Sequence, residues 1–298
     1  NAGVYMVARS SPLFLTSHTA MLIVMGIGTF TAIYAAIIAI TQTDIKRVIA
    51  YSTISSLGFM FMALGAGAWV AGIFYLMVHG FFKGLLFLGS GTVIHALGGE
   101  QDMRLMGGLR RKLPRTYWTM LVGALAMCGV FPFAGFWAKD EILGGSFAHH
   151  YYVVWAVGLV TAFLTGVYMF RLIFLTFHGE SRTPPTATRG HAPGPSMTVP
   201  LAVLAIPAAV AGLVVGWPPD AGWIHRFLEP VFVGEEAGHF ARLGVGGVLM
   251  LVALNVVLAG IALAWQLYLR RPESAARLAT RFPAVYRASL NKLYMDEG

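Results

Sequence analysis

Long apolar stretches separated by short polar segments form the main pattern of this chain. A stretch of roughly 20 apolar residues is long enough to cross a bilayer as a helix. Complete stretches of this kind lie at about residues 18–41, 46–67, 70–97, 151–177, 197–216 and 242–269, and residues 1–14 resemble the end of another. The pattern predicts an all-α, polytopic membrane protein.

One apolar stretch, at about residues 115–148, is too long for a single crossing and contains the sequence Phe131-Pro132-Phe133-Ala134-Gly135. A proline inside a helix removes a backbone hydrogen bond and clashes with the preceding turn. At membrane depth, such an interruption persists only inside protein or beside a water-filled cavity. We therefore expect one broken helix here.

The basic residues show which side each loop faces. With the tail after Pro272 included, alternate loops place 15 of the 21 lysines and arginines on one side of the membrane. The other side holds Arg9, Arg226 and Arg242, and the remaining three, Lys83, Lys139 and Arg171, fall inside spans. This asymmetry predicts that the basic side is cytoplasmic, or faces a matrix.

Composition narrows the class of protein further. Of 298 residues, 57% are hydrophobic and 11% charged, with a mean hydropathy of +0.70, which excludes an ordinary soluble domain. The net charge of +8 sits in short loops, so we do not expect nucleic acid as a partner. A single cysteine, Cys128, excludes a disulfide framework or a cysteine metal cluster. No spacing typical of a metal site or redox cofactor was found, so we expect no cofactor in this chain.

Three titratable residues recur at steps of four within the apolar run 71–96, namely Tyr75, His79 and Lys83. Steps of four keep side chains on one face of a helix. A lysine at the middle of a span is costly, and its first interpretation is functional. Imidazole exchanges protons near neutral pH, so this stripe predicts a proton-handling site. The structural alternative is an ion pair that fixes helix packing.

Further clusters lie elsewhere. Lys139, Asp140 and Glu141 follow the Pro132 break directly, where a hydrated cavity could admit protons. Asp44, Lys46 and Arg47 lie at the cytoplasmic junction of two spans, where they either take part in proton transfer or simply cap a loop. For four further residues we expect structural rather than functional roles. Arg171 snorkels to the membrane surface, His95 packs near a helix end, and His149 and His150 are solvated at a loop.

Three sequence runs together resemble one known family. These are TQTDIKRVIAYSTISSLGFMFMALG, HGFFKGLLFLGSGTVIHALGGEQDMRLMGGL and FPFAGFWAKDEIL. They are similar to the largest antiporter-like subunit of proton-pumping NADH:quinone oxidoreductase, respiratory complex I. The resemblance is dense over residues 1–180 and looser beyond, although it includes the closing LNKLYMDE.

The resemblance implies an architecture. Residues 1–180 would hold the end of one span and the second of two inverted five-helix repeats, with its broken helix and proton path. Residues 181–196 would be a polar loop, and residues 197–298 accessory transmembrane helices and the start of a cytoplasmic-side segment. Because the chain lacks an initiator methionine and the family's first repeat and lateral helix, we expect it to be a fragment.

The resemblance also implies roles for single residues. Lys83 matches the family's central lysine, and Lys139 matches the lysine on the broken helix, which serves proton exit. His79 matches a family histidine, and Asp44 with Lys46 match the family's TDIKR turn. Tyr75 departs from the pattern, because many relatives have a second histidine there, so a two-histidine relay is not expected.

The implied function is proton translocation in a respiratory chain, driven by electron transfer from NADH to quinone in other subunits of the oxidoreductase, where FMN, iron–sulfur clusters and quinone would bind. Other membrane subunits and lipid would be its partners, in a bacterial plasma membrane or, as a second choice, the mitochondrial inner membrane. The large subunit of a multi-subunit Na⁺/H⁺ antiporter is the alternative, although the loop GEQDMRLMGGL favours complex I. A purely architectural scaffold is the third interpretation.

Overall fold

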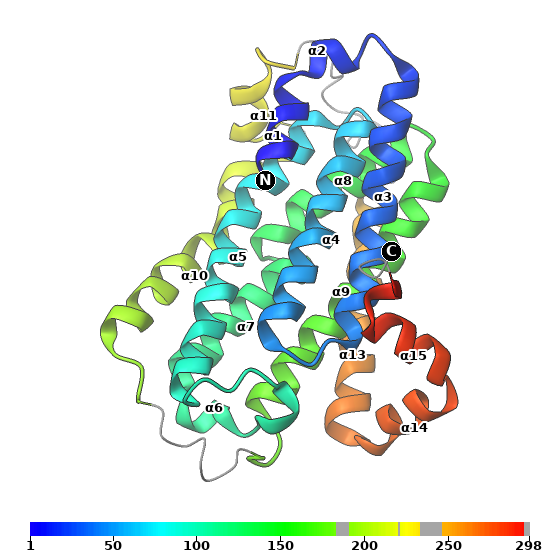
Figure 1. Ribbon diagram of the computed structural model, residues 1–298. Coiled ribbons are helices and arrows are strands. Elements are labelled where there is room, and N and C mark those ends of the chain that lie inside the picture. The colour runs from blue at the N-terminus through cyan, green and yellow to red at the C-terminus, as the bar shows by residue number, and fades with distance from the viewer. Residues whose placement is uncertain (183–190, 220, 233–245, 295–298) are drawn as a thin grey trace.

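The computed structural model describes residues 1–182, 191–219, 221–232 and 246–294 (Figure 1). These residues form helices and connecting loops, with a single isolated bridge between Asp44 and Asp102. The elements are α1 Ala2–Arg9, α2 Ser11–Phe14, α3 His18–Thr41, α4 Ile45–Gly65, α5 Trp69–Ala96, η1 Met103–Leu105, α6 Leu109–Lys112, α7 Pro114–Cys128, α8 Ala134–Ala148, α9 Tyr152–Phe177, α10 Pro195–Gly216, α11 Trp223–Leu228, α13 Gly246–Trp265, η3 Gln266–Arg270, α14 Glu273–Arg281, α15 Pro283–Leu290 and η4 Lys292–Tyr294.

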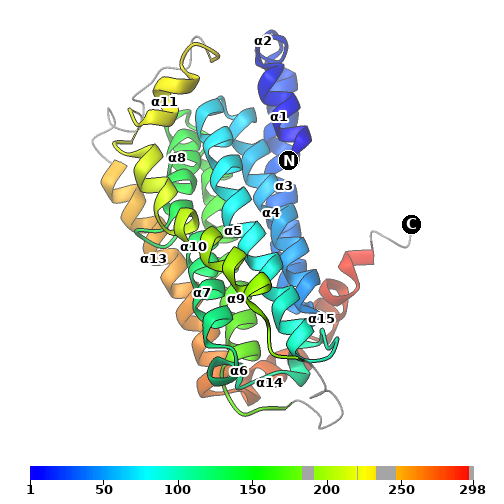
Figure 2. The same cartoon turned by 90° about the vertical axis from the view of Figure 1, so that its left-hand side faces the viewer.

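The predicted spans are confirmed in the part of the chain that the structure describes. α3, α4, α5, α9, α10 and α13 with η3 are each long and apolar enough to cross a membrane. They run side by side along one direction in both views, with α7 and α8 among them (Figures 1 and 2). The chain is an all-α, polytopic membrane protein. The first residues predicted for the last span, 242–245, lie outside the described residues.

The predicted broken helix is α7 followed by α8. α7 ends at Cys128 and is followed by Gly129, whose left-handed backbone (φ 80°) suits glycine. α8 starts at Ala134 after the Pro132 segment, and its second residue, Gly135, lies directly against the carbonyl oxygen of Ala126. A Cβ at this position would overlap that oxygen. The two half-helices therefore meet backbone to backbone at the break.

α3 and α4 are packed equally closely. A Cβ at Gly28 would meet the backbone of Met62, and one at Gly65 would meet that of Met25. Gly58 stands in the same relation to Ala32. Small residues at such positions let two membrane helices approach closely without a hydrophobic driving force. The pair forms one wall of the bundle, and α5 and α9 pack against it.

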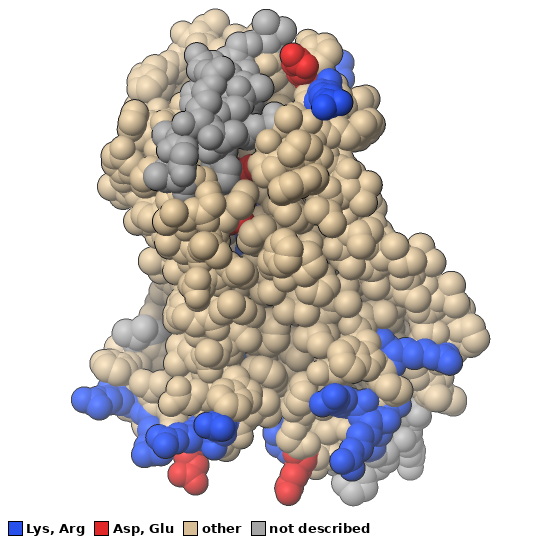
Figure 3. All heavy atoms as spheres, turned by 180° about the vertical axis from the view of Figure 1, so that it is seen from behind, with Lys and Arg blue, Asp and Glu red and all other residues tan. Residues whose placement is uncertain are grey.

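Charge separates the two ends of the bundle. Lysine and arginine side chains gather at the lower end of Figure 3, where α6, α14 and α15 lie in Figure 1. This distribution agrees with the predicted orientation, although Arg189 and Arg242 lie outside the described residues. α15 closes back onto α3 at this basic end, where the Ser289 hydroxyl lies 2.8 Å from that of Thr41 and donates to the Ile37 carbonyl at 2.9 Å.

Candidate functional site: a buried lysine pair beside the broken helix

Lys83 lies near the middle of α5 and is 5% exposed. Its ammonium Nζ donates to the hydroxyl oxygen of Ser52, and also to the Ile49 carbonyl at 3.3 Å, both on α4. The Ser52 hydroxyl itself donates to the Ile49 carbonyl at 2.7 Å, which fixes the direction of its lone pairs. Both of these partners of the predicted central lysine are uncharged.

His79 lies one turn before Lys83 and is 1% exposed. Neither ring nitrogen has a hydrogen-bond partner among the described residues. Its ring lies 5.4 Å from that of Phe82 and 6.2 Å from that of Tyr75. Leaving a buried polar group unsatisfied costs about 1–3 kcal/mol, so an imidazole in this position needs a functional or hydration role to explain it.

Tyr75 lies between the histidine and the second lysine. Its hydroxyl donates to the Ser56 hydroxyl at 3.3 Å. The Lys139 ammonium lies 6.0 Å from the centre of the Tyr75 ring and 5.2 Å from that of Phe59. The predicted stripe on α5 is therefore a buried column, and its outer end faces the broken helix.

Lys139 is buried on α8, directly after the helix break. Its Nζ donates to the Met127 carbonyl at 2.9 Å, in the last turn of α7. Carbonyls at a helix C-terminus lack intrahelical partners and carry partial negative charge. The break thus supplies the oxygen that receives this ammonium.

Asp140 and Glu141, the next two residues, are also buried. Glu141 Oε2 lies 3.2 Å from Nε2 of His225 on α11. Asp140 Oδ2 has no hydrogen-bond partner in the described part of the chain. The acidic pair therefore lies on the same half-helix as Lys139, towards the outer end.

Asp44 and Lys46 lie at the basic end, apart from the buried column. The Asp44 carboxylate accepts from the backbone N–H of Lys46 at 2.7 Å and of Arg47 at 3.1 Å, and so caps α4. The Lys46 side chain is exposed. Asp102, across the bridge from Asp44, pairs with Arg104 at 2.6 Å, and this hydrogen bond lowers the pKa of the Asp102 carboxyl.

Arg171 does not snorkel as predicted. It is buried on α9, and its Nη1 donates to the Gln42 carbonyl at 2.6 Å. The loop between α3 and α4 offers this free carbonyl within reach, so the guanidinium stays inside the protein. The predicted location at the membrane surface was wrong, and the interpretation as a structural residue stays a prediction. His149 and His150 are exposed, as predicted.

Sequence reasoning missed Ser52, Ser56 and His225. The two serines lie four residues apart on α4 and meet the polar stripe of α5. Their spacing of four residues places both hydroxyls on one face of an apolar helix, and this pattern could have indicated that they meet the polar stripe of α5. Nothing in the local sequence distinguishes His225, since its partner Glu141 lies more than 80 residues earlier.

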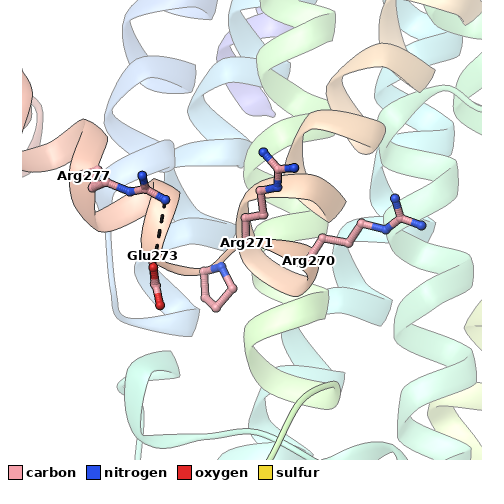
Figure 4. A pocket seen from close by; sticks show the side chains of 5 residues that line it. Arg270, Arg271, Glu273 and Arg277 are labelled. Carbon is pink, nitrogen blue, oxygen red and sulfur yellow. Dashed lines mark ion pairs between the residues drawn. The ribbon is translucent and has the colours of Figure 1, made fainter.

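A surface pocket at the basic end is separate from these residues. It is lined by Arg270, Arg271, Pro272, Glu273 and Arg277 (Figure 4). Arg277 pairs with Glu273 at 4.0 Å and both side chains are largely exposed. Such a pair contributes little, and the pocket adds no residue to the buried site.

The fold and the site together define a class of protein: a membrane helix bundle of the antiporter type, with two lysines and a histidine buried beside a broken helix. The family model described as "NADH:quinone oxidoreductase/Mrp antiporter, TM" matches residues 1–165. The chain belongs to this family.

Curated relatives and a solved structure agree with this assignment. The chain is 44% identical to NAD(P)H-quinone oxidoreductase chain 5 of Picosynechococcus sp. over 327 residues, which cover 99% of this chain and 48% of the relative. It is 44% identical to NADH-quinone oxidoreductase subunit L of Pseudomonas aeruginosa over 283 residues, or 95% and 44% of the two chains. The chain thus spans about half the length of the curated relatives it matches.

The solved structure is that of an Mrp complex from Dietzia sp., one chain of which superimposes with a TM-score of 0.63. The match covers 87% of this chain and 52% of that chain, at 18% identity. At this level of identity, the likeness establishes a shared fold.

Proposed function

We propose that this chain is part of a proton-translocating membrane subunit of an NADH:quinone oxidoreductase of the complex I type. Electron transfer would take place in partner subunits that hold FMN, iron–sulfur clusters and quinone, and this chain would contribute no redox centre. Other membrane subunits and the lipid of a bacterial membrane would surround it. The observation that carries the proposal is the buried column from Lys83 through His79 and Tyr75 to Lys139.

The surroundings of Lys83 suit a group that gains and loses a proton. A carboxylate partner would hold the ammonium form strongly, whereas a hydroxyl both donates and accepts hydrogen bonds. Ser52 can therefore serve either protonation state, while the Ile49 carbonyl accepts from both. A lysine buried in this way is able to switch when its electrostatic surroundings change.

A route for the proton follows from the order of the buried groups. We infer that a proton passes from Lys83 past His79 and Tyr75 to Lys139, and then through Asp140 and Glu141 to the outer side. Figure 3 shows a few acidic atoms among the apolar ones of the rear face, on the side away from the basic end. Asp44 and Lys46 would act at the opposite, basic end.

The alternative function is that of the large subunit of a Na⁺/H⁺ antiporter complex. The Mrp structure shares the fold, and the family description includes both classes. Relatives at 44% identity bear oxidoreductase names, and this favours the first function. Na⁺-dependent transport without any response to NADH would favour the second.

Replacement of the two lysines in the full-length subunit tests the proposal. In the assembled complex, we expect Lys83→Ala to abolish NADH-driven proton pumping in vesicles while assembly stays normal. Lys139→Ala should reduce pumping more than Lys139→Arg, which keeps a positive charge. Lys112→Ala, at the exposed basic end, is the matched control. Normal pumping in normally assembled Lys83→Ala would reject the proposal and favour a scaffold.

A further inference from the structure

The contact between Glu141 and His225 links a buried carboxyl group to a helix at the outer end of the bundle. Their atoms are 3.2 Å apart, and the side chains are 5% and 13% exposed, respectively. The imidazole is therefore the more accessible member of the pair. Glu141 is two residues from Lys139 on the half-helix that follows the break.

α11 is held in place by contacts that do not involve the pair. It packs against α10 and α5 at their outer ends. Ile224 is buried, and Gly222 lies directly against the backbone of Gly216 at the end of α10. Trp69 stacks on Phe232 at 6.1 Å, which ties the segment after α11 to the start of α5. These contacts fix α11 at both ends and hold the His225 imidazole beside Glu141.

Among the described residues, α8 places Glu141 beside His225, with Asp140 next to it in sequence. Arg226 follows His225 within α11, and Glu229 is the first residue after that helix. α10 contains no titratable side chain, and the first one along α5 is Tyr75. Of the described groups, Glu141 is the one that connects His225 with Lys139 on the buried half-helix.

We propose that His225 is the proton-exchange residue that follows Glu141 on the outer side of the path through Lys139. A protonated Glu141 gives its proton to Nε2 of His225, which leaves a carboxylate and an imidazolium as an ion pair. The imidazolium then releases a proton to water on the outer side, and the neutral ring is ready for the next transfer. This inference rests on the proposed proton-translocating function.

The alternative explanation is that the pair only fastens α11 to α8. Two substitutions separate these roles in the full-length subunit within its assembled complex. His225→Gln removes the exchangeable proton, and His225→Arg keeps a cation beside Glu141 but cannot release a proton at any relevant pH. His225→Arg should assemble even where His225→Gln does not, because it preserves the ion pair.

We expect both variants to pump at least roughly tenfold more slowly than the wild type, the scale on which a positioned acid or base contributes. Imidazole added on the outer side should partly restore His225→Gln, and the dependence of pumping on outer pH should lose the step due to the histidine. His150→Gln, a change to an exposed histidine beyond the end of α8, should behave as the wild type.

Wild-type pumping in assembled His225→Arg would show that the pair is only structural and would overturn the inference. The same conclusion would follow from an unchanged pH profile in His225→Gln. These results differ from a failure of the proposed function, in which Lys83→Ala and Lys139→Ala would also pump normally.

Discussion

Ser52 offers the sharpest test of how Lys83 is held. Ser52→Ala removes the hydroxyl that accepts from the ammonium and leaves the Ile49 carbonyl as the remaining partner of the two. A hydrogen bond to a charged group contributes about 1.5–3 kcal/mol. Because the hydroxyl also bonds the neutral amine, with about 0.5–1.5 kcal/mol, only the difference of about 1–1.5 kcal/mol favours the ammonium form. Since about 1.4 kcal/mol corresponds to a factor of ten, the protonated form of Lys83 should become roughly tenfold less populated relative to the neutral form.

Proton pumping by the assembled complex is the assay, measured beside the rate of NADH oxidation in the same vesicles. We expect Ser52→Ala to slow pumping roughly tenfold or more, and Ser52→Thr, which restores a hydroxyl, to recover most of it. Ser55→Ala is the matched control, because Ser55 is equally buried on the same helix but donates to the Ala32 carbonyl. Equal effects of Ser52→Ala and Ser55→Ala would refute the reasoning and indicate a general packing defect.

Two further predictions concern stability. Gly135→Ala would place a Cβ against the Ala126 carbonyl oxygen, so we expect a loss of stability of about 1–3 kcal/mol or more, seen as a lower thermal midpoint or failed assembly. Gly91→Ala is the control and should be neutral, because a Cβ there meets nothing within 4 Å; equal midpoints for the two variants would contradict the close contact at the break. Arg171→Met removes the hydrogen bond to the Gln42 carbonyl and should lower stability by about 1.5–3 kcal/mol. Arg171→Lys should have an intermediate thermal midpoint, and Arg115→Met, at an exposed position, should keep the wild-type midpoint. Equal midpoints for Arg171→Met and Arg115→Met would show that the buried hydrogen bond contributes nothing.

Much of the architecture was predictable because membrane helices are defined by local composition. Each apolar run has to satisfy its backbone internally, so the spans could be recognised one at a time. The break at Pro132 was equally visible, because proline acts on its own helix. Lys83 and Lys139 could be chosen for the same reason, since a buried charge is improbable wherever it occurs.

The partners of those lysines were not predictable from local sequence. The oxygen of Met127 and the hydroxyl of Ser52 become partners only when α7 meets α8 and α4 meets α5. Arg171 was misjudged for a related reason. Its distance from the helix end indicated snorkelling, whereas a free carbonyl at Gln42, from another pair of helices, holds it inside. Contacts between helices, rather than the helices themselves, decide these details.

The glycine contacts between α3 and α4 bear on which parts of the bundle can move. Backbones that touch at Gly28, Gly58 and Gly65 leave no room for one helix to rock or slide against the other without a collision. α4 is therefore held in a fixed position against α3, and it presents the Ser52 hydroxyl and the Ile49 carbonyl to Lys83. If protons pass beside Lys83, we expect the lysine side chain on α5 to move against this closely packed pair of helices.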